Sequence, residues 1–162
     1  KSGDAAPDFE LLGIDGKKHK LAEYTGGEAL VVLFTSNHCP TSHSIERRLQ
    51  KFYDEYKAKG VKLVAINPNH PEGLSADELG YGEFGDSFEE MKPYAKKNGW
   101  ESPYLYDGET QQVARAYGCL ATPHVFAAAA AEPETAQVQR LGWLLDRLDQ
   151  SVADADVALA AQ

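Results

Sequence analysis

Cys39 is the residue with the clearest capacity for chemistry, because it stands between a strand pattern and a helix pattern. Residues 30–34 form an apolar run with two β-branched side chains, which is typical of a buried strand. Downstream, apolar side chains recur at helical spacing, at Ile45, Leu49, Phe52, Tyr53 and Tyr56. Gly60 stops this pattern. Pro40 suits the first helical position, so Cys39 is expected at the N-cap.

The N-cap position favours a reactive thiol. A sulfur there lies beside free backbone N–H groups and the positive end of the helix dipole, and both favour its ionised, nucleophilic form. The alternative is a buried cysteine that acts as a small apolar residue, but the polar residues around Cys39 oppose simple burial. Two roles stay open for His38: a protonated imidazole that favours the thiolate further, or a solvated loop histidine.

Composition limits the classes of partner. The chain has 162 residues, enough for one domain with a sizeable core, and we expect a single domain over residues 1–162. The formal net charge of −9 argues against nucleic acid and anionic membrane surfaces as partners. No apolar stretch approaches the length of a membrane span. The two cysteines, Cys39 and Cys119, are too few for a disulfide scaffold but sufficient for a redox couple.

Further strands and helices are expected around the cysteine. Residues 9–12 and 17–21, joined by Asp15-Gly16, have the pattern of a β-hairpin. Residues 61–67 read as a second buried strand, which predicts a βαβ unit with the first. Residues 68–86 form an insertion too long for a minimal connection, and we expect a surface excursion without chemistry.

The second half of the chain is expected to alternate helices and strands. Ser87 and Glu90 form a capping-box pattern for a helix that ends near Gly99. The later expected elements are a strand over 103–106, a helix over 110–117, a strand from 125, a returning strand over 138–143 and a closing helix over 144–159. The alanine run 127–131 is either a genuine edge segment or a stretch whose side chains were not identified.

Three features in order along the chain resemble the thioredoxin-like redoxin family, the alkyl hydroperoxide reductase/thiol-specific antioxidant and TlpA-like group. They are residues 3–9 with Asp15-Gly16, the turn over residues 34–40, and Tyr117-Gly118 followed by Thr122-Pro123. The resemblance implies an α/β, thioredoxin-like fold, with a mixed central β-sheet flanked by helices and an N-terminal β-hairpin. It also implies a cis peptide bond before Pro123, placed beside the reactive cysteine.

The resemblance further implies a thiol–disulfide oxidoreductase with Cys39 as nucleophile and a partner groove shaped by Thr122 and Pro123. Dithiol members carry Cys-x-x-Cys, whereas here Ser42 stands at the second position and cannot resolve a mixed disulfide. Resolution then falls to Cys119, a small thiol or a partner protein, although we expect Cys119 to pack beneath a helix end. The expected partners are protein or small-molecule thiols and disulfides, and no cofactor is expected.

A peroxiredoxin-type thiol peroxidase is one alternative. Peroxiredoxins present Pro-x-x-x-Thr/Ser-x-x-Cys and use an arginine from a later strand to polarise the peroxide. Ser36 fits the hydroxyl position, but Val32 occupies the proline position and Thr122 stands where the arginine is expected. Disulfide exchange is therefore the preferred function.

Metal binding and a redox-silent role also stay open. Cys39, His43 and His124 could bind copper or zinc, and Sco-type copper chaperones use the same fold, with a second cysteine that His43 would replace. The chain could also be a redox-silent thioredoxin-like binding module in a larger assembly.

The location of the protein is expected from the start of the chain and from the family resemblance. Because the chain begins at Lys1 and its sole methionine is Met91, we expect a processed or trimmed chain. An extracytoplasmic, periplasmic location is expected from the TlpA-like resemblance, with a cytoplasmic one as the alternative.

Overall fold

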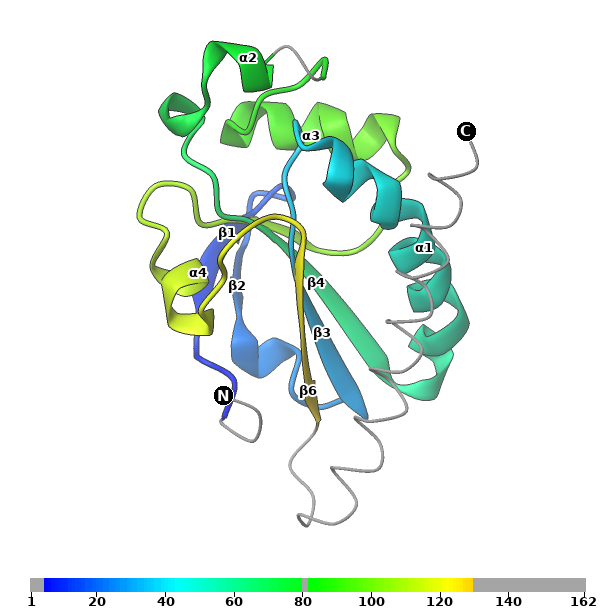
Figure 1. The fold of residues 1–162 in the computed structure, drawn as a ribbon. Helices are drawn as coiled ribbons and strands as arrows, with labels where there is room; N and C mark the ends of the chain where they lie inside the picture. Colours follow the sequence, from blue (N-terminus) through cyan, green and yellow to red (C-terminus); the bar gives the residue numbers. More distant parts are fainter. Residues whose placement is uncertain (1–4, 80–81, 130–162) are drawn as a thin grey trace.

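The computed structural model describes residues 5–79 and 82–129, and in this part six strands form one mixed sheet (Figure 1). The strands are β1 (Glu10–Gly13), β2 (Lys18–Lys20), β3 (Ala29–Phe34), β4 (Val61–Asn67), β5 (Tyr104–Tyr106) and β6 (His124–Ala129). Their order across the sheet is β2-β1-β5-β4-β3-β6. β3, β4 and β5 are parallel, whereas β1, β2 and β6 run antiparallel to their neighbours.

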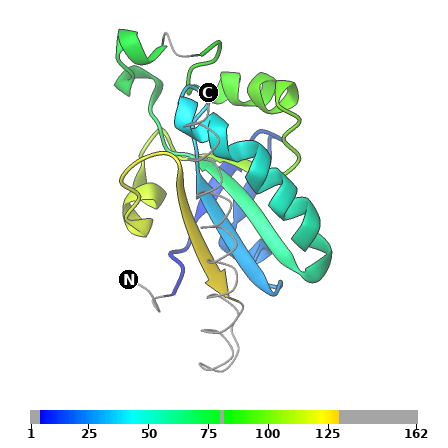
Figure 2. The same ribbon diagram turned by 45° about the vertical axis from the view of Figure 1, so that its right-hand side comes forward.

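Helices cover both faces of this sheet. They are α1 (Pro40–Tyr56), α2 (Ala76–Leu79), α3 (Phe88–Lys97) and α4 (Gln112–Tyr117), with 3-10 turns at Leu21–Glu23, Lys57–Lys59 and Pro71–Gly73. α1 and α3 lie on one side of the sheet and α4 on the other (Figure 2). Within the described residues, no helix has the length and apolar character needed to cross a membrane.

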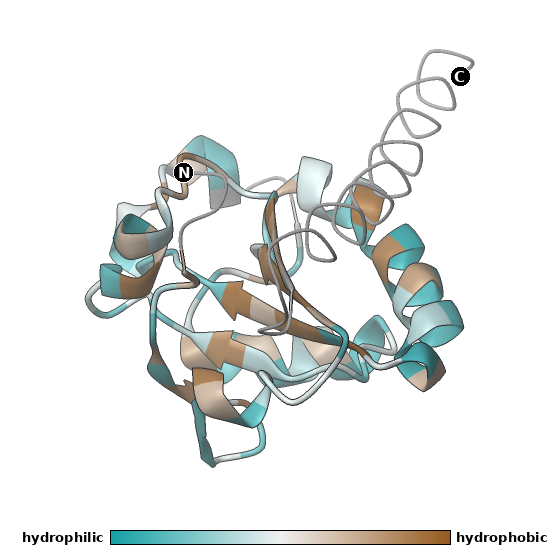
Figure 3. Cartoon of the chain, turned by 90° about the horizontal axis from the view of Figure 1, so that it is seen from below, coloured by the Kyte–Doolittle hydropathy of each residue, from teal (hydrophilic) through white to brown (hydrophobic). Residues whose placement is uncertain are grey.

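The central strands divide their side chains between two cores. Val31 and Leu33 of β3 pack with α1 and α3, whereas Val32 and Phe34 pack with α4 on the opposite face. This division follows from the alternation of side chains along a strand. Parallel strands covered on both faces are expected to be largely apolar, and the central strands of Figure 3 are coloured mostly brown.

Most of the expected elements are confirmed within a few residues. The hairpin, the parallel β3–α1–β4 unit and the helix capped by Ser87 and Glu90 all form. Part of the alanine run lies in β6, which pairs with β3 and is the outermost strand on that side of the sheet among the described residues. The strand expected over 138–143 and the helix expected over 144–159 fall outside the described residues. The single domain over 1–162 stays a prediction.

Candidate active site

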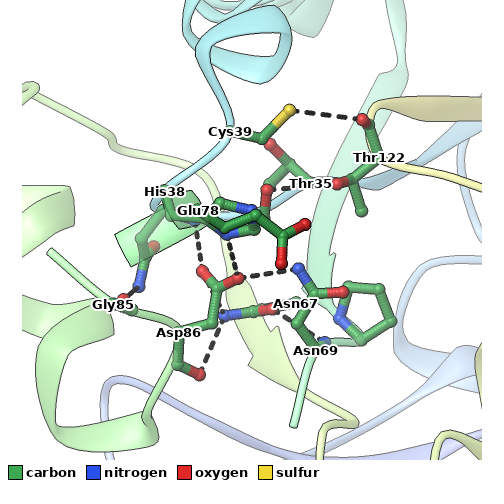
Figure 4. A network of polar contacts seen from close by, with 12 residues as sticks. Thr35, His38, Cys39, Asn67, Asn69, Glu78, Gly85, Asp86 and Thr122 are labelled. Atoms are coloured by element: carbon green, nitrogen blue, oxygen red, sulfur yellow. Dashed lines mark hydrogen bonds and ion pairs between the residues drawn. The ribbon is translucent and has the colours of Figure 1, made fainter. Parts of the chain in front are cut away.

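Cys39 is the N-cap residue of α1, as expected, but its sulfur does not bond to the backbone of the first turn. The thiol instead donates a hydrogen bond to the carbonyl oxygen of Thr122, at a sulfur–oxygen distance of 3.5 Å (Figure 4). A protonated thiol carries a donor, and the free groups of a helix N-terminus are donors as well. The expected sulfur–backbone contact is therefore replaced by a contact with an acceptor across the site.

The loop before β6 closes over Cys39. The bond between Thr122 and Pro123 is cis, as the family resemblance implied. The Thr122 hydroxyl also shares a hydrogen bond of 3.1 Å with the buried hydroxyl of Ser36, which belongs to the turn that follows β3. The loop is thus tied to this turn by two contacts, one from the Thr122 carbonyl and one from its side chain.

His38 is buried and paired, so the interpretation as a solvated loop histidine is wrong. Its side chain is 9% exposed, and Nδ1 lies 2.6 Å from Oδ2 of Asp86. Asp86 is fully buried at the end of the 68–86 insertion. Its carboxylate also accepts the backbone N–H of Asn37 at 2.6 Å and the side-chain amide of Asn69 at 2.7 Å (Figure 4). The insertion therefore reaches the active-site turn, contrary to the expectation of a surface excursion.

Asn37 completes this polar network. It is 1% exposed, yet both ends of its side chain are satisfied. Its amide donates to the carbonyl of Gly85 at 2.8 Å, and its carbonyl oxygen accepts the hydroxyl of Tyr104 at 2.9 Å. Buried polar groups with a full set of partners hold one conformation of a turn. The turn before Cys39 is therefore fixed by contacts from the insertion and from β5.

Glu46 is a buried carboxyl group that the sequence patterns did not reveal. It lies on the inner face of α1 and is 5% exposed. Its two oxygens accept hydrogen bonds from the hydroxyls of Tyr94, at 2.5 Å, and Thr35, at 3.2 Å. Burial nevertheless raises the pKa of Glu46 above its ordinary value, because it penalises the charged form more than these bonds favour it.

The raised pKa of Glu46 predicts a pH dependence of stability. Just above the ordinary Glu pKa, the folded state holds more protons than the unfolded state, so the Glu46 contribution falls as pH rises. Glu46→Gln should remove this contribution, so the stability measured by urea unfolding should fall less steeply as pH rises above about 4.3, the ordinary pKa of Glu. Glu55→Gln, an exposed change on the same helix, should leave the wild-type slope intact. A Glu46→Gln slope equal to that of wild type would contradict the prediction.

The metal set expected as an alternative is not assembled. His43 donates from Nε2 to the Asn37 carbonyl at 2.7 Å and stacks on Tyr94, and His124 lies against Phe126. Over residues 5–79 and 82–129, no group of three His, Cys, Asp or Glu side chains is arranged to hold a metal ion. The geometry therefore does not support copper or zinc binding by Cys39, His43 and His124.

Cys119 lies at the end of α4, half-buried against the core on that face of the sheet. Its backbone N–H bonds to the carbonyl of Ala114, and its thiol donates to the carbonyl of Ala121 at 3.2 Å. Burial raises the pKa of the Cys119 thiol, which keeps the sulfur in its unreactive protonated form at neutral pH. Both features suit the expected packing role, and a resolving role stays a hypothesis.

Sequence comparison finds relatives that are named as a thiol-disulfide oxidoreductase and as a peroxiredoxin. A family model described as "AhpC/TSA family" matches residues 2–144. The thiol-disulfide oxidoreductase ResA of Geobacillus thermodenitrificans is 27% identical over 124 residues, which are 76% of this chain and 61% of that protein. The peroxiredoxin Bcp of Escherichia coli is 33% identical over 75 residues, which are 46% of this chain and 48% of that protein. The chain thus spans about three fifths or less of the length of these curated relatives.

Solved structures share the fold. A hypothetical protein from Sinorhizobium meliloti is 35% identical, with a TM-score of 0.69 over 79% of this chain and 64% of that one. The thioredoxin domain of a thiol-disulfide oxidoreductase from Bacteroides vulgatus is 15% identical, with a TM-score of 0.60 over 79% of this chain and 81% of that one. The second likeness shows the fold alone, and the fold is thioredoxin-like.

Proposed function

Because the chain belongs to the AhpC/TSA family, we propose that it is a thiol–disulfide oxidoreductase with Cys39 as its single nucleophilic thiol. The observation that carries the proposal is the position of Cys39 at the N-cap of α1, facing the Thr122 carbonyl. The helix N-terminus stabilises the thiolate once the proton has left. The buried turn before the cysteine holds the backbone that carries Cys39 in one conformation.

The reaction needs two exchange steps. In the first, the Cys39 thiolate attacks a partner disulfide, forms a mixed disulfide and releases the other partner sulfur as a thiolate. In the second, another thiolate attacks the mixed disulfide and releases Cys39. Ser42 carries no sulfur, so the second thiolate comes from a small thiol or a partner protein, or from Cys119.

The partner is proposed to be a protein or small-molecule disulfide that lies along the loop before β6. Thr122 and Pro123 line this approach, and Leu120 in the same loop is 92% exposed, which offers an apolar contact. An exposed leucine two residues before Thr122, whose carbonyl contacts the Cys39 sulfur, suits a partner with apolar side chains near its disulfide. The proposed location is extracytoplasmic, on the TlpA-like resemblance.

Thiol peroxidase activity is the second candidate, supported by the likeness to peroxiredoxin Bcp. One hydrogen bond of the site does not fit the peroxidase arrangement. The Ser36 hydroxyl, at the position that resembles the peroxiredoxin motif, shares its hydrogen bond with Thr122 rather than with Cys39. Disulfide exchange is therefore placed first.

Restoring a second sulfur tests the one-thiol proposal. Wild-type protein incubated with glutathione disulfide should accumulate a mixed disulfide on Cys39. Ser42→Cys places two thiols one helical turn apart, so it should form an internal disulfide and turn over in an insulin reduction assay supplied with dithiothreitol. Mass spectrometry reports the first result and turbidity the second.

Thr41→Cys is the matched control for this experiment. It adds a thiol to the same turn, but residues two apart do not face each other on a helix, so it should behave as wild type. Wild-type turnover that is as fast as that of Ser42→Cys and is abolished by Cys119→Ala would refute the single-thiol mechanism and assign resolution to Cys119.

A further inference from the structure

The hydroxyl of Ser42 is the buried polar group of the site that lacks a partner. Ser42 is 0% exposed, and its Oγ has no hydrogen bond to any part of the chain that the structure describes. Leaving a buried hydroxyl unpaired destabilises a folded protein. The Ser42 hydroxyl is therefore expected to find a partner in another protonation state of the site.

Ser42 lies where it can serve the sulfur of Cys39. Cys39 is the N-cap of α1 and Ser42 follows three residues later, the spacing at which an N-cap side chain meets the first turn of its helix. In the thiol form, the sulfur donates to Thr122 and needs no donor from Ser42. The two residues thus share one end of the helix without bonding to each other.

Ionisation changes the Cys39 sulfur from a hydrogen-bond donor into an acceptor. A thiolate has no proton to donate, so it loses the bond to the Thr122 carbonyl and faces the negative end of that dipole. It now requires donors, and the Ser42 hydroxyl is buried, unpartnered and one turn away. The Ser36 and Thr122 hydroxyls already share a bond with each other.

We propose that the Ser42 hydroxyl donates a hydrogen bond to the ionised sulfur of Cys39, which turns from the Thr122 carbonyl toward the first turn of α1 when its proton leaves to solvent. The inference rests on the proposed function and makes Ser42 a catalytic residue of it. The same donor stabilises the Cys39 sulfur when it departs from the mixed disulfide as a thiolate, because a better stabilised thiolate leaves faster. The Ser42 hydroxyl is then unpaired in the thiol form because its partner, the Cys39 thiolate, exists only in the reactive form.

The test measures the reaction rate of Cys39 as a function of pH in several variants. The other charged groups of the site must be the same in every variant, so that a shift of the profile reports the substitution alone. They are the His38–Asp86 pair at the turn before α1, His43 and Glu46 on α1, and Tyr94 on α3. None of them is altered in the variants compared. Reaction with 4,4′-dithiodipyridine, a neutral disulfide, is followed by release of its coloured product in a Cys119→Ala background.

Ser42→Ala should move the midpoint of this profile upward by about one pH unit, a tenfold change in the ratio of thiolate to thiol. The plateau rate at high pH should rise by about threefold, because a less stabilised thiolate is a stronger nucleophile. The thermal midpoint of Ser42→Ala should be unchanged or higher, since the change removes an unpaired buried hydroxyl. A purely structural role of Ser42 would not raise the midpoint and the plateau rate together while leaving the thermal midpoint unchanged or higher.

Two further variants complete the experiment. Ser42→Thr keeps the hydroxyl and should retain the wild-type midpoint. Ser44→Ala makes the same change on the same helix, where the hydroxyl bonds locally to the Thr41 carbonyl, and should leave the profile unchanged. A Ser42→Ala midpoint equal to that of wild type would overturn the donor role and leave the proposed function standing. A Cys39 that reacts no faster than a free thiol in every variant would overturn both.

Discussion

Asp86→Ala is expected to lower the free energy of unfolding by about 2–6 kcal/mol, because it leaves two buried hydrogen-bond donors without a partner and each costs about 1–3 kcal/mol. Asp86 is 0% exposed and its carboxylate holds the His38 imidazole and the Asn37 backbone N–H, each at 2.6 Å. Without it, both donors are buried and unpaired. Exchange at Cys39 should slow as well, because the turn that presents the sulfur loses its anchor.

Urea unfolding measures the first effect and single-turnover exchange the second. Asp86→Asn keeps the size of the side chain and one acceptor oxygen, so its loss should be smaller than that of the alanine variant. Glu89→Ala removes an exposed carboxylate three residues away, and its change should stay within about 0.5 kcal/mol. An Asp86→Ala variant as stable as Glu89→Ala would show that the network does not hold the turn.

The role of Asp86 could not be predicted from the sequence because its contacts are distant along the chain. Local patterns correctly placed Ser87 and Glu90 as a helix start, and Asp86 appeared only as the residue before it. Its bond to His38 joins residues 48 apart, and such pairs depend on how strands and insertion assemble. The same limit explains why the sequence leaves both roles of His38 open.

Features decided by nearby residues were predictable. The apolar run 30–34 and Pro40 together fix where β3 ends and α1 begins, so the N-cap position of Cys39 followed from the sequence. Glu46 stands next to Ile45 on the buried face of α1, but this position alone does not reveal its burial. A charged residue beside an apolar stripe is either at its solvent edge or a buried group with partners, and the distinction needs Tyr94, which is 48 residues away.

Cys39→Ser should abolish mixed-disulfide formation, the largest loss of activity expected for any substitution in this chain. A hydroxyl is not ionised at neutral pH and does not attack a disulfide, so the reaction should fall to background. Cys119→Ala should keep the wild-type rate of the first exchange step, because the Cys119 thiol is half-buried with a raised pKa. Loss of that step in Cys119→Ala and its retention in Cys39→Ser would exchange the roles of the two cysteines.

The most direct test of Cys39 as the reactive thiol is competitive alkylation of the wild-type protein with limiting iodoacetamide at pH 7, followed by peptide mass spectrometry. Both cysteines are free, so each reports its own rate in the same sample. The helix N-terminus favours the Cys39 thiolate and burial disfavours that of Cys119, so labelling of Cys39 should be at least about tenfold faster. Equal rates would contradict the role of Cys39 and favour a redox-silent binding module, whereas faster labelling of Cys119 would make Cys119 the reactive thiol.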